Sequence, residues 1–108
     1  MGADQYPEFK KITEPVFADV EAIVMMARDR YYLPLKAVER RVAAHLMHRS
    51  GMCYQEIAEV MRVRKRSVER YLEHPVPPIY DIDENGQRVS VSIETLTNMS
   101  VEVDTIAV

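Results

Sequence analysis

The sequence predicts a mainly α-helical fold, in which a bundle of about four helices is followed by a C-terminal β-hairpin. Apolar residues recur at helical spacing as far as His74. Three prolines between residues 75 and 78 then end the helical pattern, because proline lacks a backbone N–H. Beyond them, Asn85 and Gly86 separate two segments of alternating polarity, which is the strongest short hairpin signal. We therefore expect three parts: an N-terminal arm over 1–13, a helical domain over 14–74, and a proline linker with hairpin and acidic tail over 75–108.

The first helix is expected over residues 14–30. Thr13 followed by Pro15 is a helix start signal, since a hydroxyl can cap free amides and proline in the first turn loses no needed donor. The apolar stripe of this helix consists of Val16, Val20, Ile23 and Ala27.

Three further helices follow at short intervals. The second is expected over 35–49, and Gly51 stands where a left-handed C-cap would need glycine. A third over 54–61 and a fourth over 65–73 are separated by a tight connection at 62–64. The stripe of the second helix consists of Leu35, Val38, Val42 and Leu46.

The hairpin is expected over residues 79–93, with Val89, Val91 and Ile93 on one face. Because a lone hairpin is marginal in water, this face must either pack on the helices or mediate a homodimer. The last stretch, residues 100–108, also alternates, and the sequence leaves open whether it is a third strand or a frayed tail.

Composition excludes several classes of protein. The 108 residues fit one ordinary domain with an appendage. With three glycines, the chain cannot form the glycine-rich phosphate cradle of dinucleotide or nucleotide-triphosphate enzymes. Cys53 is the single cysteine, so no intramolecular disulfide forms. The chain shows neither a signal peptide at its start nor a membrane span, and we expect a cytoplasmic protein.

The formal net charge of −3 conceals an uneven distribution. Residues 28–74 contain eleven Lys and Arg against six Asp and Glu. The flanking segments are acidic: two lysines oppose five acids before residue 28, and Arg88 alone opposes six acids after residue 74. A basic middle between acidic ends indicates that the middle of the chain meets a polyanion.

The pattern of residues 53–72, CYQEIAEVMRVRKRSVERYL, predicts two short helices joined by a sharp turn. Ala58 is expected where the two helices cross closely, Val63 fills the turn, and Val68 packs beneath Ala58. The expected buried set consists of Ile57, Ala58, Met61, Val63, Val68 and Leu72.

This pattern resembles the helix-turn-helix motif of bacterial and phage transcription regulators, in the sigma-factor region-four-like and related tri- or tetrahelical form. The resemblance covers about 20 residues strongly and extends weakly back through residues 39–52. Three positions depart from the family pattern. Arg62 occupies the turn where glycine is usual, at a cost of about 1 kcal/mol for a positive φ. Cys53 and Arg64 stand where Ser or Thr would cap the two helices, although Glu56 keeps half of a capping box.

The resemblance implies that helix 65–73 enters the major groove of DNA with its N-terminal residues near base edges. Arg66 and Arg70 are then expected to reach bases, and Arg62 and Arg64 to lie nearer phosphates. Glu69 either contacts a base or pairs with a neighbouring cation. The full expected DNA-binding set is Gln55, Arg62, Arg64, Lys65, Arg66, Ser67, Glu69 and Arg70.

The sequence thus favours sequence-specific binding of double-stranded DNA by a bacterial or phage transcriptional regulator, with no cofactor. The alternative is a helix-turn-helix module, an adaptor or antirepressor, that binds protein without reading DNA. No Ser, His and carboxylate arrangement indicates an enzyme. His45, His48 and Cys53 lack the fourth ligand of a zinc site, so we expect no metal. His45 is expected to pack in the domain, and His48 to face solvent or phosphate.

Overall fold

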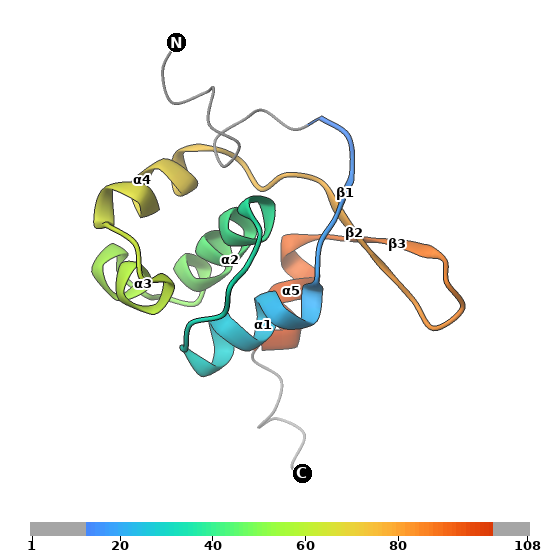
Figure 1. Ribbon diagram of the computed structural model, residues 1–108, viewed down its shortest axis with the longest axis horizontal. Coiled ribbons are helices and arrows are strands. Elements are labelled where there is room, and N and C mark those ends of the chain that lie inside the picture. The colour runs from blue at the N-terminus through green and yellow to red at the C-terminus, as the bar shows by residue number, and fades with distance from the viewer. Residues whose placement is uncertain (1–12, 101–108) are drawn as a thin grey trace.

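The structure is a computed structural model that describes residues 13–100 (Figure 1). Within these residues, five helices pack together, and a three-stranded sheet lies beside them. The elements in chain order are β1 (Val16–Phe17), α1 (Val20–Asp29), α2 (Ala37–Arg49), α3 (Tyr54–Met61), α4 (Lys65–Glu73), β2 (Ile79–Ile82), β3 (Arg88–Val91) and α5 (Ile93–Ser100). The prediction of a mainly α fold is therefore confirmed.

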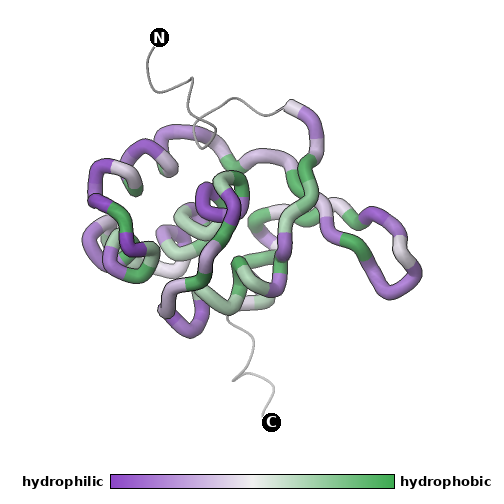
Figure 2. Tube along the Cα trace, in the orientation of Figure 1, coloured by the Kyte–Doolittle hydropathy of each residue, from purple (hydrophilic) through white to green (hydrophobic). Residues whose placement is uncertain are grey.

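The central element is α2, which packs against each of the other four helices. Its buried residues come from several sides of the helix: Glu39, Arg41, Val42, Ala43, Ala44, Leu46 and Met47. Figure 2 shows hydrophilic segments on α3 and α4 and at the tip of the hairpin, among other places on the outside of the molecule. A helix that is buried around most of its circumference organises the core, and the surrounding helices expose their polar faces.

The expected start of the first helix at residue 14 is wrong, because α1 begins only at Val20. The backbone at Val16 and Phe17 pairs with β2 instead of closing a helical turn: the amides of Val16 and Ala18 donate to carbonyls of residues 78 and 80 at 3.1 Å each. Asp19 is the actual N-cap, since its carboxylate accepts from the amide of Ala22 at 3.1 Å.

One buried carboxylate fixes the starts of both α1 and α2. Glu39 is 4% exposed, and its two oxygens accept from the amides of Asp19 at 2.7 Å and Lys36 at 2.9 Å. Lys36, in an extended conformation, is therefore the N-cap of α2, which begins two residues later than predicted. Gly51 follows this helix with φ +100, as its C-cap position requires. The bounds of α3 and α4 agree with the prediction.

The predicted hairpin is present as β2 and β3, antiparallel with Ile79 opposite Val91 and Ile82 opposite Arg88. Asp83 organises its turn by accepting from the amides of residues 85 and 87 at 2.8 and 2.9 Å. The sheet gains a third strand from β1, parallel to β2, which the sequence did not predict. Because Ile79 is 2% exposed in the same buried cluster as the helices, the hairpin is anchored on the helical core.

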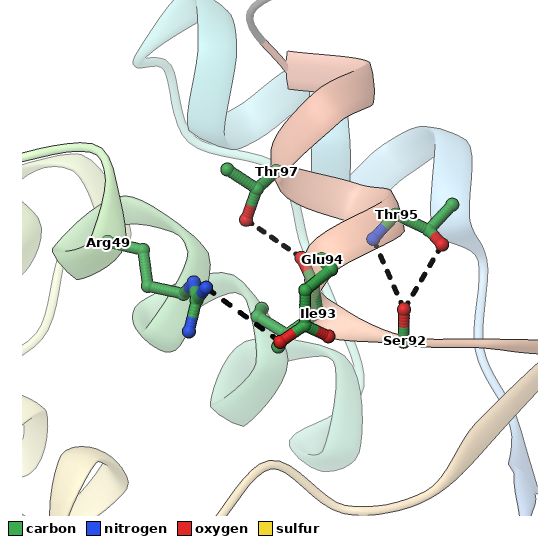
Figure 3. Close-up of polar contacts among 6 residues, drawn as sticks. All are labelled: Arg49, Ser92, Ile93, Glu94, Thr95 and Thr97. Carbon is green, nitrogen blue, oxygen red and sulfur yellow. Dashed lines mark hydrogen bonds and ion pairs between the residues drawn. The ribbon is translucent and has the colours of Figure 1, made fainter.

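The helix α5 was also not predicted, and Ile93 begins it rather than ending the hairpin. Ser92 supplies the start signal: its hydroxyl accepts from the amide of Thr95 at 3.2 Å, as Figure 3 shows. Glu94 lies 3.9 Å from Arg49 at the end of α2, and fully buried Leu96 joins the core. Residues 1–12 and 101–108 lie outside the described part, so the predictions for the arm and for the final residues are not addressed by the structure.

Candidate nucleic-acid interface

The helices α3 and α4 pack on each other and on α2, and together they form one end of the molecule (Figure 1). Four of the expected core residues are at most 4% exposed, whereas Val63 and Leu72 are only partly buried. The four are Ile57, Ala58, Met61 and Val68. Tyr71 is 1% exposed, and its hydroxyl accepts from Arg40 Nε at 3.1 Å.

The connection between α3 and α4 is a tight turn built on a strained residue. Arg62 has φ 59, the left-handed conformation in which glycine is preferred. The next amide, of Val63, donates to the carbonyl of Ala58 at 3.0 Å, which is the pattern of a Schellman C-cap. The prediction of a positive φ at this arginine is therefore confirmed. Such a conformation costs a residue other than glycine about 1 kcal/mol.

The start of α4 carries three exposed cations, Arg64, Lys65 and Arg66. Arg64 is the N-cap in an extended conformation, and its side chain makes no capping hydrogen bond. Within residues 13–100, no hydrogen bond or ion pair involves the side chains of these three residues. The first amides of a helix lack intrahelical acceptors, so this end presents both free N–H groups and unneutralised positive charge.

The other described helices begin in the opposite way. Each has a carboxylate in its first turn: Glu21 in α1, Glu39 in α2, Glu56 in α3 and Glu94 in α5. Of the five helices in the described residues, α4 alone has no acid there. Since the helix dipole favours anions at an N-terminus, the positive charge at the start of α4 opposes helix stability.

The remaining residues of the predicted DNA-binding set lie around this cluster and differ in exposure and in the contacts that they already make. Glu69 is exposed and forms no ion pair with Lys65 or Arg66 in the described structure, so the proposed pairing is absent. Arg70 is half-buried, with its Nε 3.8 Å from the carboxylate of Glu73. Gln55 is exposed at the start of α3, where its amide donates to Glu59 at 3.3 Å.

Tyr32 belongs to this surface although the sequence assigned it no function. The guanidinium of Arg62 lies over its ring, 4.7 Å from the centroid, and 39% of Tyr32 is exposed. Ser67 lines the same region from α4, next to Arg40 from α2. The signal in the sequence was weak, because an exposed tyrosine in a loop 30 residues before the turn has no periodic relation to it.

The histidines behave as expected from the sequence. His45 is half-buried, with Nε2 2.6 Å from the carbonyl oxygen of His74 at the end of α4, and burial lowers the pKa of its imidazole. His48 is exposed and contacts the ring of Tyr54 at a centroid distance of 5.6 Å. Among residues 13–100, no three His, Cys, Asp or Glu side chains gather in a way that could hold a metal ion.

Comparison of the chain with protein-family models, with curated proteins and with solved structures gives no match. In the described part of the chain, none of the helices combines the length and the hydropathy needed to cross a membrane. The candidate site therefore rests on its own geometry and charge.

Proposed function

We propose that the protein binds double-stranded DNA sequence-specifically, as a bacterial or phage transcriptional regulator of the helix-turn-helix type, with α4 in the major groove. The observation that carries the proposal is the exposed cluster of Arg64, Lys65 and Arg66 at the uncapped start of α4. A duplex supplies phosphates in a regular array, which would neutralise this charge and release counterions. The acidic hairpin lies at the opposite end of the molecule, where it would not repel the duplex (Figure 1).

Within this proposal, Arg66 is the foremost base-reading residue. It is exposed in the first turn of α4, and an arginine there can donate twice to guanine O6 and N7. Arg70 would reach a base only by exchanging its contact with Glu73. Arg62, Arg64 and Lys65 would contact phosphates, which fixes position without reading sequence.

The first experiment is a mobility-shift assay against a random-duplex pool, followed by sequencing of the bound fraction. With about four to six phosphate contacts, log K should fall against log salt with a slope of about −4 to −5. Arg66→Ala should cost about 1–3 kcal/mol on the preferred duplex and relax the preference at one base pair. Arg88→Ala is the matched control, because it removes the same charge from the hairpin.

The outcomes separate two classes of function. Equal weakening of preferred and scrambled duplexes by Arg66→Ala would show that this residue does not read bases. A failure to shift any duplex at low salt would refute DNA binding and favour the adaptor or antirepressor alternative. In that alternative, the acids of the hairpin would contact a basic partner protein; they include exposed Glu84 and partly buried Asp81 and Asp83.

A further inference from the structure

A hollow of about 350 Å³ lies beside the turn between α3 and α4. Its polar lining comes from separate parts of the chain: Tyr32, Arg40, Arg62, Ser67 and Tyr71. The lining thus holds two guanidinium groups and three hydroxyls, and it includes no carboxylate. Such a set of donors is suited to an anion with several oxygen atoms.

Arg62 is placed so that its donors remain usable. Its guanidinium carbon lies over the ring of Tyr32, 4.7 Å from the centroid. This cation–π contact is made with the face of the ring and uses none of the five N–H donors of the guanidinium for a hydrogen bond. No hydrogen bond or ion pair of the Arg62 side chain occurs within residues 13–100.

Arg40 and Ser67 complete the wall of the hollow. Arg40 is held by hydrogen bonds from Nε to the hydroxyl of Tyr71 at 3.1 Å and from Nη1 to the carbonyl of Leu35 at 2.8 Å. A positive charge fixed in this way is preorganised and loses little entropy when an anion binds. The hydroxyl of Ser67 has no hydrogen-bond partner in the described structure and can donate to that anion.

We propose that this hollow binds a phosphate group, with Arg62 and Ser67 donating to its oxygens, Arg40 supplying fixed charge, and Tyr32 positioning Arg62. The inference rests on the proposed function for the expected source, a backbone phosphate of the duplex. A free phosphorylated small molecule would offer the same chemistry. The two sources are distinguished by experiment.

The first arm uses the full chain without DNA. Inorganic phosphate is titrated at constant ionic strength, with chloride as the reference anion, while NMR follows the amide of Ser67 and the Nε–H of Arg62. We expect saturable shifts with phosphate that chloride does not produce. Arg62→Gly, which suits the left-handed turn, and Ser67→Ala should each weaken phosphate binding about tenfold, whereas Arg88→Gln on the hairpin should not change it.

Tyr32 is tested separately as a positioning residue. Tyr32→Ala should weaken phosphate binding, and Tyr32→Phe should restore it, because the ring and not the hydroxyl holds Arg62. A merely structural role would instead lower the unfolding temperature without this difference in binding. If Tyr32→Phe binds phosphate as poorly as Tyr32→Ala, the positioning role is refuted.

The second arm replaces single phosphates of the preferred duplex by uncharged methylphosphonates. Loss of affinity at one linkage in the wild type, but not in Arg62→Gly, identifies the backbone as the source. Phosphate binding without any duplex shift would support the hollow with a free ligand and refute the proposed function. The inference would be overturned if the protein bound duplex but neither its affinity for inorganic phosphate nor the effect of any single methylphosphonate depended on Arg62 and Ser67. That outcome would leave the proposed function intact.

Discussion

Replacing Arg64 with serine should stabilise the protein while weakening DNA binding. Arg64 is the N-cap of α4 and provides no capping hydrogen bond, although its backbone has the extended conformation that a capping serine uses. A serine cap contributes about 1 kcal/mol, and removing a cation from a helix N-terminus adds about 0.5 kcal/mol. The expected gain of about 1.5 kcal/mol corresponds to a rise in the midpoint of thermal unfolding of about 6–12 °C for a domain of this size.

Thermal unfolding followed by circular dichroism measures the gain, and duplex titration at two salt concentrations measures the loss. The salt slope should fall by about one for Arg64→Ser. Arg49→Ser is the control and should lower the unfolding midpoint. Arg49 lies in the last turn of α2, where a cation is favourable, and it pairs with Glu94. An unchanged or lower midpoint for Arg64→Ser would refute the conclusion that the start of α4 is uncapped and destabilised by its charge.

Three further predictions address the fold and the assembly. Val68→Ala should cost about 2–3 kcal/mol in denaturant unfolding, because Val68 is fully buried and loses two methyl groups, whereas exposed Glu69→Ala should be nearly neutral. Burial lowers the pKa of His45 below its ordinary value of 6.5, so the folded state binds a proton on this residue less readily than the unfolded state does. The free energy of unfolding should therefore decline as the pH falls below 6.5. In His45→Gln this acid-dependent decline should disappear, and a persistent decline would assign it to other groups. Finally, β3 is an edge strand of the sheet, and Val89 on it is 45% exposed, so we expect a homodimer that forms through this strand. Light scattering should detect the dimer in the wild type and a monomer in Val89→Lys. A monomeric wild-type protein would contradict the expectation.

Local signals in the sequence were sufficient for α3, α4 and the hairpin. The residues at which these elements end are set by local conformations close by in the sequence, such as the left-handed conformation of Arg62 and the turn at Asp83. The start of α1 could not be predicted in this way, because Val16 and Phe17 pair with a strand more than 60 residues later. Thr13 and Pro15 are an adequate start signal that a tertiary contact overrides.

The helix α5 was missed for a related reason. The alternating pattern of residues 89–93 is typical of a strand, and Ile93 continues it although this residue is the first of a short helix. The β-branched side chain of Ile93 also favours a strand. Ser92 was the useful signal, as a capping residue directly before the helix. The hollow at the turn was beyond sequence reasoning, since Tyr32 and Arg40 meet Arg62 only through the packing of the helices.

The helix α4 forms in spite of its own N-terminal sequence, and this has a bearing on function. A nine-residue helix is marginal in isolation, so its stability must come from its buried face, where Val68 and Tyr71 are at most 1% exposed. That packing leaves the exposed first turn free to carry residues that do not favour a helix. Departures from local rules that are concentrated in one exposed segment, here residues 62–66, are expected where a chain is shaped by binding. An anion at this end of α4 would satisfy both the uncapped amides and the clustered cations, which no described carboxylate does.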